Sequence, residues 1–459
     1  MKIIIVGLGQ TGTLLAHRIA AEYHDATVVD CDKERVEAVT NLYNVSGVCG
    51  SGASKEILLQ AGAETADVII AVSPVDEVNL MACMVAKKCG THYAVARIHR
   101  PELAQDREYF AEAFRIDFIT NPKLDTALEM FRQIGMPGKV KADAYFSDVA
   151  TIIRINMDKN IIPEGMSMRE VKNFFDTDML VATVTRGDKL VIPKGDFVIQ
   201  PGDVVGIIAA DTAVSQIIMK LSLMRRPAKR VVLVGGGTVA YYLGKKLLED
   251  KKSVIILEND KKRCAELAQL LPKAEISYAD GVDADVLLEE GLKKADVCVS
   301  LTGNDDANLV ISLFAWSCGV ESVITRVNAT AYERLLNKVN MDITISPAVI
   351  SADRVMGFVR NVAVYNADGN DIQCLYQLAG GMAEAIEFIA YDNCQKLGIM
   401  FRQPEFRLKK DILVAMIIRQ GKVIIPDGNS CIQSGDRVVV ISKKGHGLNT
   451  LNDIFASQR

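Results

Sequence analysis

The sequence predicts an α/β protein built as a tandem duplication, in which a doubly wound parallel-sheet domain and a small α+β domain each occur twice. The opening MKIIIVGLGQTGTLLAHRIA is written again as KRVVLVGGGTVAYYLGKKLL. Short β-branched runs alternate with segments of helical spacing, which is typical of a parallel sheet covered by helices on both faces. With 459 residues, 49% of them hydrophobic, the chain can bury several cores.

The repeat extends over nearly the whole chain. Gly235 lies 228 positions after Gly7, and the same offset carries Asp30 to Glu258. Further on, DMLVATVTRGDKLVIPKG is matched by DILVAMIIRQGKVIIPDG, which predicts a small domain in each half. We therefore expect large domains at 1–140 and 226–365, small domains at 141–225 and 366–459, and a linker near Arg225–Arg230.

The elements follow in chain order. In the first large domain we expect strands at Ile3–Val6, Thr27–Asp30, Val68–Val72, Tyr93–Ile98 and Phe118–Thr120. In the first small domain we expect strands at Ile152–Asn156, Leu180–Thr185 and Leu190–Ile192, with TRGDK as a hairpin turn. Ser167 and Glu170 have the spacing of a capping box, which predicts a short helix.

Two apolar helices are expected after Pro122 and Pro347. The apolar side chains at issue are Leu128, Met130, Phe131 and Ile134 in the first and Val355, Met356, Phe358 and Val359 in the second. They are candidates for contacts between domains, and the alternative is that each helix packs in the core of its own domain.

A glycine motif follows the first predicted strand and opens a helix. Gly7 permits a tight turn, Gly9 lets the backbone approach a pyrophosphate, and Gly12 lets the helix pack on the strand. The helix N-terminus then offers free N–H groups to phosphates. Asp30 ends the second strand, where a carboxylate can accept hydrogen bonds from ribose hydroxyls. This Rossmann-like pattern predicts binding of NAD(H) or an adenine nucleotide and disfavours a 2′-phosphate.

The second copy departs from the first. It has Gly235 and Gly237, but Ala240 takes the third position, and Glu258 must retract to reach the same hydroxyls. We therefore expect two inequivalent clefts.

Other residues are expected at the same sheet edges. Ser73 and Thr302 follow the fourth strands, where they could face a ligand or cap the next helix. Arg97 and Arg326 end the fifth strands; each could bind phosphate or pair with an acid such as Asp117 or Asp342.

Two acidic sets open the next helices. Asp76-Glu77-x-Asn79 and Asp305-Asp306-x-Asn308 are interpreted as helix-start acids that complement the helix dipole, with a divalent-cation site as the minority alternative. Trp316 is interpreted as a packing residue. The QPGD stretch at Gln200–Asp203 is interpreted as a turn without chemistry.

Composition argues against several classes. The formal charge of −4 disfavours a nucleic-acid binder, and no apolar run approaches the length of a membrane span. The N-terminus does not have the pattern of a signal peptide. The ten cysteines form no Cys-x-x-Cys pair and do not cluster with histidines, so we expect no structural metal and reduced thiols in a cytoplasmic protein.

These residues together resemble the tandem form of the regulator of potassium conductance (RCK, or KTN) family. The resemblance rests on the duplicated glycine motif with its acid, the GSGAS...LLQAG...ADVIIAVS continuation from Gly50, and the small domain after each nucleotide unit. It implies a subunit that forms a homo-oligomeric ring, a tetramer in the family, beneath a potassium-translocating membrane subunit of the Trk type. Such a subunit gates its partner in response to NAD(H) or ATP/ADP.

The resemblance also implies the ligand contacts. In the first copy these are Gly7, Leu8, Gly9, Gln10, Thr11, Gly12, Asp30, Ser73, Pro74 and Arg97. In the second they are Gly235, Gly236, Gly237, Thr238, Val239, Glu258, Thr302, Gly303 and Arg326.

Two other functions are weighed against this one. An NAD-dependent oxidoreductase with a small substrate needs a substrate domain that brings a proton-transfer group to the nicotinamide, and neither small domain has a histidine except His446. A redox-sensing transcription regulator is disfavoured because no basic recognition helix is apparent. We therefore expect a sensor without catalytic residues.

Overall fold

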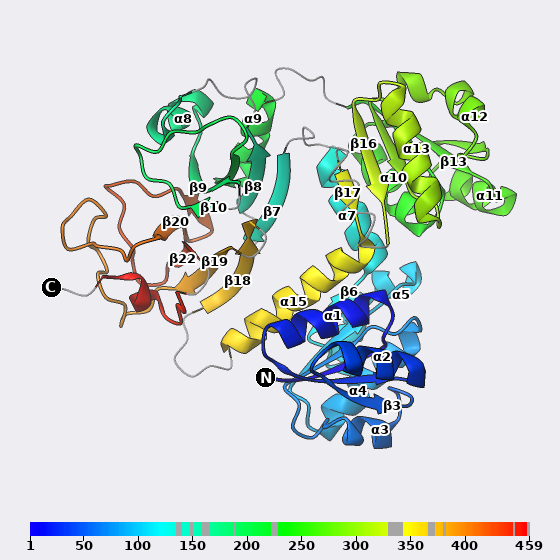
Figure 1. Cartoon of the computed structure of the whole chain (residues 1–459), viewed down its shortest axis with the longest axis horizontal. Helices are drawn as coiled ribbons and strands as arrows, with labels where there is room; N and C mark the ends of the chain where they lie inside the picture. The colour runs from blue at the N-terminus through cyan, green and yellow to red at the C-terminus, as the bar shows by residue number, and fades with distance from the viewer. Residues whose placement is uncertain are drawn as a thin grey trace. The chain divides into compact units, whose positions relative to one another are not determined.

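A computed structural model describes residues 1–134, 140–146, 150–157, 165–187, 189–221, 228–328, 343–365, 372–379, 382–443 and 446–456. The chain forms two compact units (Figure 1). One comprises Met1–Gly135 with Ala228–Val359 and holds both large domains; the other comprises Met136–Pro227 with Arg360–Arg459 and holds both small domains. The first half of the linker predicted at Arg225–Arg230 lies outside the described residues.

The first large domain is a six-stranded parallel sheet in the order β3-β2-β1-β4-β5-β6. Its strands are β1 (Lys2–Val6), β2 (Asp25–Asp30), β3 (Ser46–Cys49), β4 (Val68–Ala71), β5 (Tyr93–Arg97) and β6 (Phe118–Thr120). Its helices are α1 (Gln10–Ala21), α2 (Lys33–Leu42), α3 (Lys55–Gln60), α4 (Asp76–Cys89), α5 (Pro101–Gln105), α6 (Arg107–Phe114) and α7 (Pro122–Ile134). This strand order reverses between β1 and β4, which places a crevice at their carboxyl ends.

The second large domain repeats this plan, with the parallel order β14-β13-β12-β15-β16-β17. Its strands are β12 (Arg230–Val234), β13 (Ser253–Glu258), β14 (Glu275–Tyr278), β15 (Val297–Ser300), β16 (Ser322–Arg326) and β17 (Ile343–Ile345). Its helices include α10 (Thr238–Glu249), α11 (Lys261–Leu270), α12 (Ala284–Glu289), α13 (Asp305–Ser317) and α15 (Pro347–Tyr365). The predicted doubly wound fold is therefore confirmed in both halves.

The two large domains exchange their last helices. Met130 and Ile134 of α7 are buried in one apolar cluster with Val231 and Leu243 of the second domain. In return, Phe358 of α15 stacks on Phe118 of the first domain at a ring-centroid distance of 5.4 Å.

Ion pairs reinforce the exchange. Arg354 of α15 pairs with the buried carboxylate of Asp125 on α7, and Asp353 pairs with Arg18 of α1. Figure 1 shows α15 lying along α1. The sequence left open whether these helices contact another domain or pack in their own, and the structure decides for contact between domains.

The small domains are five-stranded antiparallel sheets, β10-β9-β11-β8-β7 and β18-β19-β22-β20-β21. The first contains β7 (Val140–Phe146), β8 (Ala150–Asn156), α8 (Met168–Phe175), β9 (Met179–Arg186), β10 (Lys189–Val191), β11 (Val204–Ala210) and α9 (Asp211–Leu221). The second contains β18 (Ile372–Leu378), β19 (Ala383–Ile389), β20 (Ile412–Arg419), β21 (Lys422–Ile424) and β22 (Arg437–Lys443). They share one apolar core, in which Ile152 and Ile208 of the first meet Met416 and Ile441 of the second.

Local contacts explain these small domains. The short helix predicted after Ser167 is present as α8, and one bond of the expected capping box forms, because the Ser167 amide donates to the Glu170 carboxylate at 2.8 Å. The Ser167 hydroxyl donates to the same carboxylate at 2.6 Å. Arg186 forms a bidentate ion pair with Asp203, in which Nε and Nη2 donate to the two carboxylate oxygens at 2.7 and 2.8 Å. Arg419 and Asp436 form the same bidentate pair in the second small domain. The acid of the QPGD stretch is therefore a structural partner of β9. Among the described helices, none has the length and apolarity needed to cross a lipid bilayer.

Candidate nucleotide-binding clefts

Each cleft begins at a glycine in the left-handed region of backbone space. Gly7 has φ of +96°, and a Cβ atom there would lie 2.6 Å from the Ser73 amide nitrogen. Gly235 has φ of +106°, and its Cβ would lie 2.9 Å from the Thr302 nitrogen. Only glycine satisfies both the torsion and the close approach of the fourth strand.

The second glycine of each motif faces open space. A Cβ atom on Gly9 or Gly237 would meet no atom within 4 Å. Both residues are the N-caps of their helices, α1 and α10, without any side-chain capping bond. The first amide groups of each helix are thus accessible from the cleft, as an anion site at a helix N-terminus requires.

The third position differs between the copies. A Cβ atom on Gly12 would lie 1.8 Å from the Gly7 carbonyl oxygen. The second copy carries Ala240, which is fully buried in the core beside β12. The first turn is therefore packed more closely against its helix than the side chain of alanine would permit.

The carboxylate at the end of the second strand holds the glycine turn. Asp30 accepts hydrogen bonds from the amides of Leu8, at 2.6 Å, and Asp32, at 2.9 Å. Glu258 accepts the equivalent bonds from Gly236, at 2.6 Å, and Asp260, at 2.8 Å. The longer glutamate thus retracts to the aspartate's place. Each carboxylate oxygen keeps a free lone pair for a further donor.

A buried asparagine, which the sequence interpretation missed, ties the fourth and fifth strands together. The Asn79 side chain accepts from the Ser73 amide at 2.8 Å and donates to the carbonyls of Ser73 and Arg97 at 2.9 Å. Asn308 makes the same three bonds to Thr302 and Arg326. The sequence feature that could have indicated this role is that an asparagine recurs at the same buried position of the matching helices, α4 and α13, in both copies.

The acids beside these asparagines act as braces. Asp76 is 3% exposed and accepts from the amides of His99 and Arg100, and Asp305 accepts from the Asn328 amide. The described residues contain no group of acids, histidines and cysteines able to hold a metal ion. Asp76 and Asp305 therefore have a second role besides complementing the helix dipole, because each fixes the loop that follows the fifth strand of its sheet.

Ser73 and Thr302 are not the helix caps. The N-caps of α4 and α13 are Val75 and Asn304. Each hydroxyl instead donates to the carbonyl two residues on, at 3.2 Å in Ser73 and 3.1 Å in Thr302.

The arginines at the ends of β5 and β16 are desolvated cations. Arg97 donates to the Ser73 carbonyl at 2.8 Å, and burial lowers the pKa of its guanidinium to about 10. Burial likewise lowers the pKa of Arg326. Within the described residues, Nε of each is buried without a hydrogen-bond partner.

The proposed acid partner of Arg97 is engaged elsewhere. Asp117 bonds to Lys87 and to the Ala94 amide, so the alternative of an Arg97–Asp117 pair is wrong. Asp342, the acid considered for Arg326, lies outside the described residues. A buried guanidinium with an unused donor favours an anionic ligand.

Trp316 corrects another expectation. It was interpreted as a packing residue, yet it lies on α13 with 59% of its surface exposed. Leu313 and Val310, one and two helical turns earlier, are 47% and 53% exposed. The equivalent α4 positions, Met84 and Met81, are 37% and 44% exposed. Helical spacing placed these residues on one face, which proves to be the outer one.

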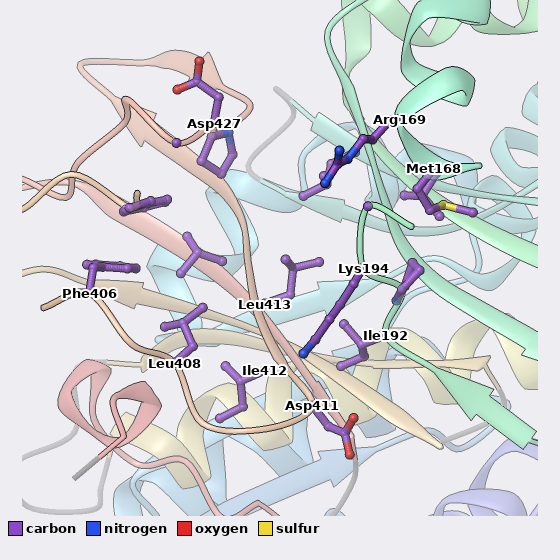
Figure 2. A pocket seen from close by; sticks show the side chains of 18 of the residues that line it. Met168, Arg169, Ile192, Lys194, Phe406, Leu408, Asp411, Ile412, Leu413 and Asp427 are labelled. Carbon is purple, nitrogen blue, oxygen red and sulfur yellow. The ribbon is translucent and has the colours of Figure 1, made fainter. Parts of the chain in front are cut away.

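A hollow of about 1210 Å³ lies between the small domains (Figure 2). The matched segments after β10 and β21 both line it, and Figure 2 labels Arg169 and Lys194 from the first small domain and Asp411 and Asp427 from the second. Its walls mix both signs of charge with apolar side chains. Among the described residues that line it, none has a buried polar side-chain atom without a hydrogen-bond partner, whereas the two arginines of the glycine clefts each have one.

The structure therefore brings the predicted residues together at two matching sheet edges. The glycine turn follows the first strand, the acid ends the second, and Ser73 or Thr302 and the arginine follow the fourth and fifth. Pro74 and Gly303 are exposed beside the helix starts. An open helix N-terminus, an acceptor for ribose hydroxyls and a buried arginine whose Nε has no hydrogen-bond partner among the described residues together fit a phosphorylated nucleoside.

Comparisons with known sequences agree with this arrangement. Residues 3–122 and 231–347 match the TrkA-N domain family, and residues 152–222 match the TrkA-C domain family. The Trk system potassium uptake protein TrkA of Haemophilus influenzae is 30% identical over 99% of this chain and 98% of its own length. That of Halomonas elongata is 31% identical over 97% of this chain and 96% of its own.

Solved structures show the same fold. A structure of the GsuK channel bound to NAD superposes with a TM-score of 0.63 and 14% identity, covering 96% of this chain and 77% of that one. The GsuK RCK domain superposes with a TM-score of 0.63 and covers 92% of its own chain. At this level of identity the likeness concerns the fold.

Proposed function

Because this chain belongs to the TrkA family of potassium uptake proteins, we propose that it is a nucleotide-sensing regulatory subunit of a membrane potassium uptake system. The observation that carries the proposal is the duplicated cleft. In both copies an open glycine turn, a carboxylate 2.6 Å from a turn amide and a buried arginine with an unused Nε lie at one sheet edge. We assign no catalytic residue.

In each cleft the chain offers three kinds of contact. The helix amides after Gly9 and Gly237 bind phosphate, Asp30 and Glu258 accept from ribose hydroxyls, and Arg97 and Arg326 pair with negative charge. NAD(H) and ATP/ADP all carry an adenosine and a pyrophosphate, so both kinds of ligand fit. The GsuK channel was solved bound to NAD, which supports the same ligand class here.

We further propose that the protein works as a homo-oligomeric ring on the inner face of the cell membrane, held there by a potassium-translocating subunit of the Trk type. The exposed apolar positions on α4 and α13 support self-assembly, because contiguous exposed apolar residues mark contact surfaces. A ligand that binds one state of the ring tenfold better than another contributes about 1.4 kcal/mol per site.

Calorimetry with ATP, ADP, NAD and NADH tests the binding half of the proposal. The Asp30→Ala variant removes charged hydrogen bonds of about 1.5–3 kcal/mol, so binding at the first cleft is expected to weaken roughly ten- to hundredfold. Asp67→Ala is the matched control, because Asp67 is an acid of the same domain whose carboxylate accepts from the Lys2 amide at 2.7 Å, at the other end of the first strand. Unchanged affinity in Asp30→Ala would exclude this site. Steady oxidation of NADH with a small metabolite would instead favour the oxidoreductase.

A further inference from the structure

Two cysteines lie at neighbouring strand ends beside the first cleft. Cys31 directly follows Asp30 at the end of β2, and Cys49 ends β3 as the register partner of Asp30. The Cys49 thiol donates to the Cys31 carbonyl oxygen at 3.6 Å. For neighbouring strands this register puts the two Cα atoms about 6 Å apart, within the range that a disulfide spans.

These are the accessible thiols of the described chain. Of the nine cysteines that the structure describes, only Cys31 and Cys49 are exposed, while Cys83, Cys298 and Cys394 are buried. Burial raises the pKa of the Cys298 thiol to about 12, which leaves it unreactive. An oxidant in solution therefore meets the pair at the cleft first.

The second cleft lacks the pair. Its residue after Glu258 is Asn259, and the register partner of Glu258 is Tyr278. Cys264 donates to the Glu258 carbonyl at 3.4 Å, but no second exposed thiol stands beside it in the described residues. Any chemistry of two thiols is thus restricted to one of the two sites.

The thiol pair is joined to the residue that holds the glycine turn. The Gly50 amide, next to Cys49, donates to the Asp30 carbonyl at 2.9 Å, and the Asp30 carboxylate holds the Leu8 and Asp32 amides on either side. A bond between the thiols would draw Cys31 toward β3. That displacement shifts the Asp30–Asp32 segment, which carries the ribose acceptor.

We propose that Cys31 and Cys49 form a reversible disulfide that weakens nucleotide binding at the first cleft, an inference that rests on the proposed function. One thiolate attacks a hydroperoxide, giving a sulfenic acid and releasing water or an alcohol. The second thiol displaces the sulfenic oxygen as water and forms the S–S bond. Two thiols are oxidised and one hydroperoxide is reduced. A dithiol reductant restores both thiols by exchange.

The test uses the full-length chain carrying Gly237→Val, which silences the second cleft. The protein is treated with hydrogen peroxide or with a dithiol reductant, and the cross-linked peptide is identified by mass spectrometry without reduction. ADP affinity is then measured by calorimetry on both samples. Cys31→Ser and Cys49→Ser remove the pair, and Cys264→Ser is the matched control beside the other carboxylate.

Oxidation is expected to link residues 31 and 49 and to weaken ADP binding at least tenfold, with recovery on reduction. The two serine variants keep ADP binding and become insensitive to peroxide, whereas Cys264→Ser responds like the parent. A reduced protein that binds ADP but never forms the bond, or forms it without losing affinity, overturns the inference. If the reduced protein binds no nucleotide while the chain without Gly237→Val does, the first cleft is not a nucleotide site and the inference is overturned. If neither protein binds a nucleotide, the proposed function itself is overturned.

Discussion

The first cleft has Leu8, Asp30 and Val39 at the positions where the second cleft has Gly236, Glu258 and Leu267. Leu8 is 3% exposed, so its side chain is buried at the glycine turn. A Cβ atom on Gly236 would lie 2.6 Å from Leu267 and 2.9 Å from the Glu258 carboxylate. In the first copy the turn itself contributes a buried side chain, that of Leu8. In the second copy the turn has only glycine at this position, and Leu267 and Glu258 occupy the neighbouring volume.

The outer side of the turn differs as well. Arg263 donates from Nε to the Gly236 carbonyl at 2.8 Å and is 26% exposed at its side chain. Its counterpart Arg35 pairs with Asp32 instead and is 57% exposed. The same backbone fold therefore forms two clefts that are lined by different side chains. For this reason we expect the two clefts to bind nucleotides with different affinity or selectivity.

The largest expected effect comes from closing each cleft separately. Gly9→Val and Gly237→Val each place a branched side chain in the open space before a helix N-terminus, where a pyrophosphate approaches the backbone. Each variant is expected to abolish one phase of a nucleotide titration. Gly9→Val removes the tighter phase and Gly237→Val the weaker or differently selective one. Identical titrations from both variants would show that the clefts are equivalent.

A smaller effect is expected at the third motif position. Gly12→Ala puts a methyl group 1.8 Å from the Gly7 carbonyl oxygen, so the helix must shift, and overpacking of this kind costs about 1–3 kcal/mol of unfolding free energy. The reciprocal Ala240→Gly is expected to cost at most about 1 kcal/mol, through chain entropy and a lost methyl group. Denaturant unfolding of both variants measures the difference, and equal losses would contradict the tighter packing of the first turn.

The smallest effect concerns pH. Burial, and then the charge of Arg97, lowers the pKa of His99 to about 4. The unfolded chain, with a histidine pKa near 6.5, binds the proton more readily between about pH 4 and 6.5, so stability is full above this window and is lost as pH falls through it.

The second copy supplies the matching variant, because Asn328 occupies the place of His99 and cannot titrate there. Between pH 7 and 5, the parent is expected to lose about 1 kcal/mol more than His99→Asn, allowing for the partial exposure of the ring. Parallel stability curves for the two proteins would show that His99 does not contribute.

The sequence predicted the features that depend on periodicity and repetition. It identified both parallel sheets, the small antiparallel domains and the positions of both glycine motifs. The strand β3 was not among the predicted runs, because it lies at the sheet edge and three of its four residues are exposed. An edge strand of that kind lacks the apolar run on which the prediction depends.

Other features depend on tertiary contact. The amphipathic patterns of α7 and α15 fit an apolar surface on either domain, so the exchange of these helices could not be read from them. The roles of Asn79 and Asn308 depend on two strand ends meeting one side chain. Apolar residues at helical spacing, such as those around Trp316, share one face of a helix, but the spacing alone does not show whether that face is turned to the core or to the solvent.

We propose that the nucleotide bound at these clefts controls a potassium-translocating partner. The most direct measurement is potassium flux through that partner in reconstituted vesicles containing this protein, with ATP exchanged for ADP and NADH exchanged for NAD. We expect the potassium flux to change when the nucleotide is exchanged, and we expect Asp30→Ala to reduce this change. Flux that is the same with every nucleotide, and unaffected by Asp30→Ala, would contradict the proposal.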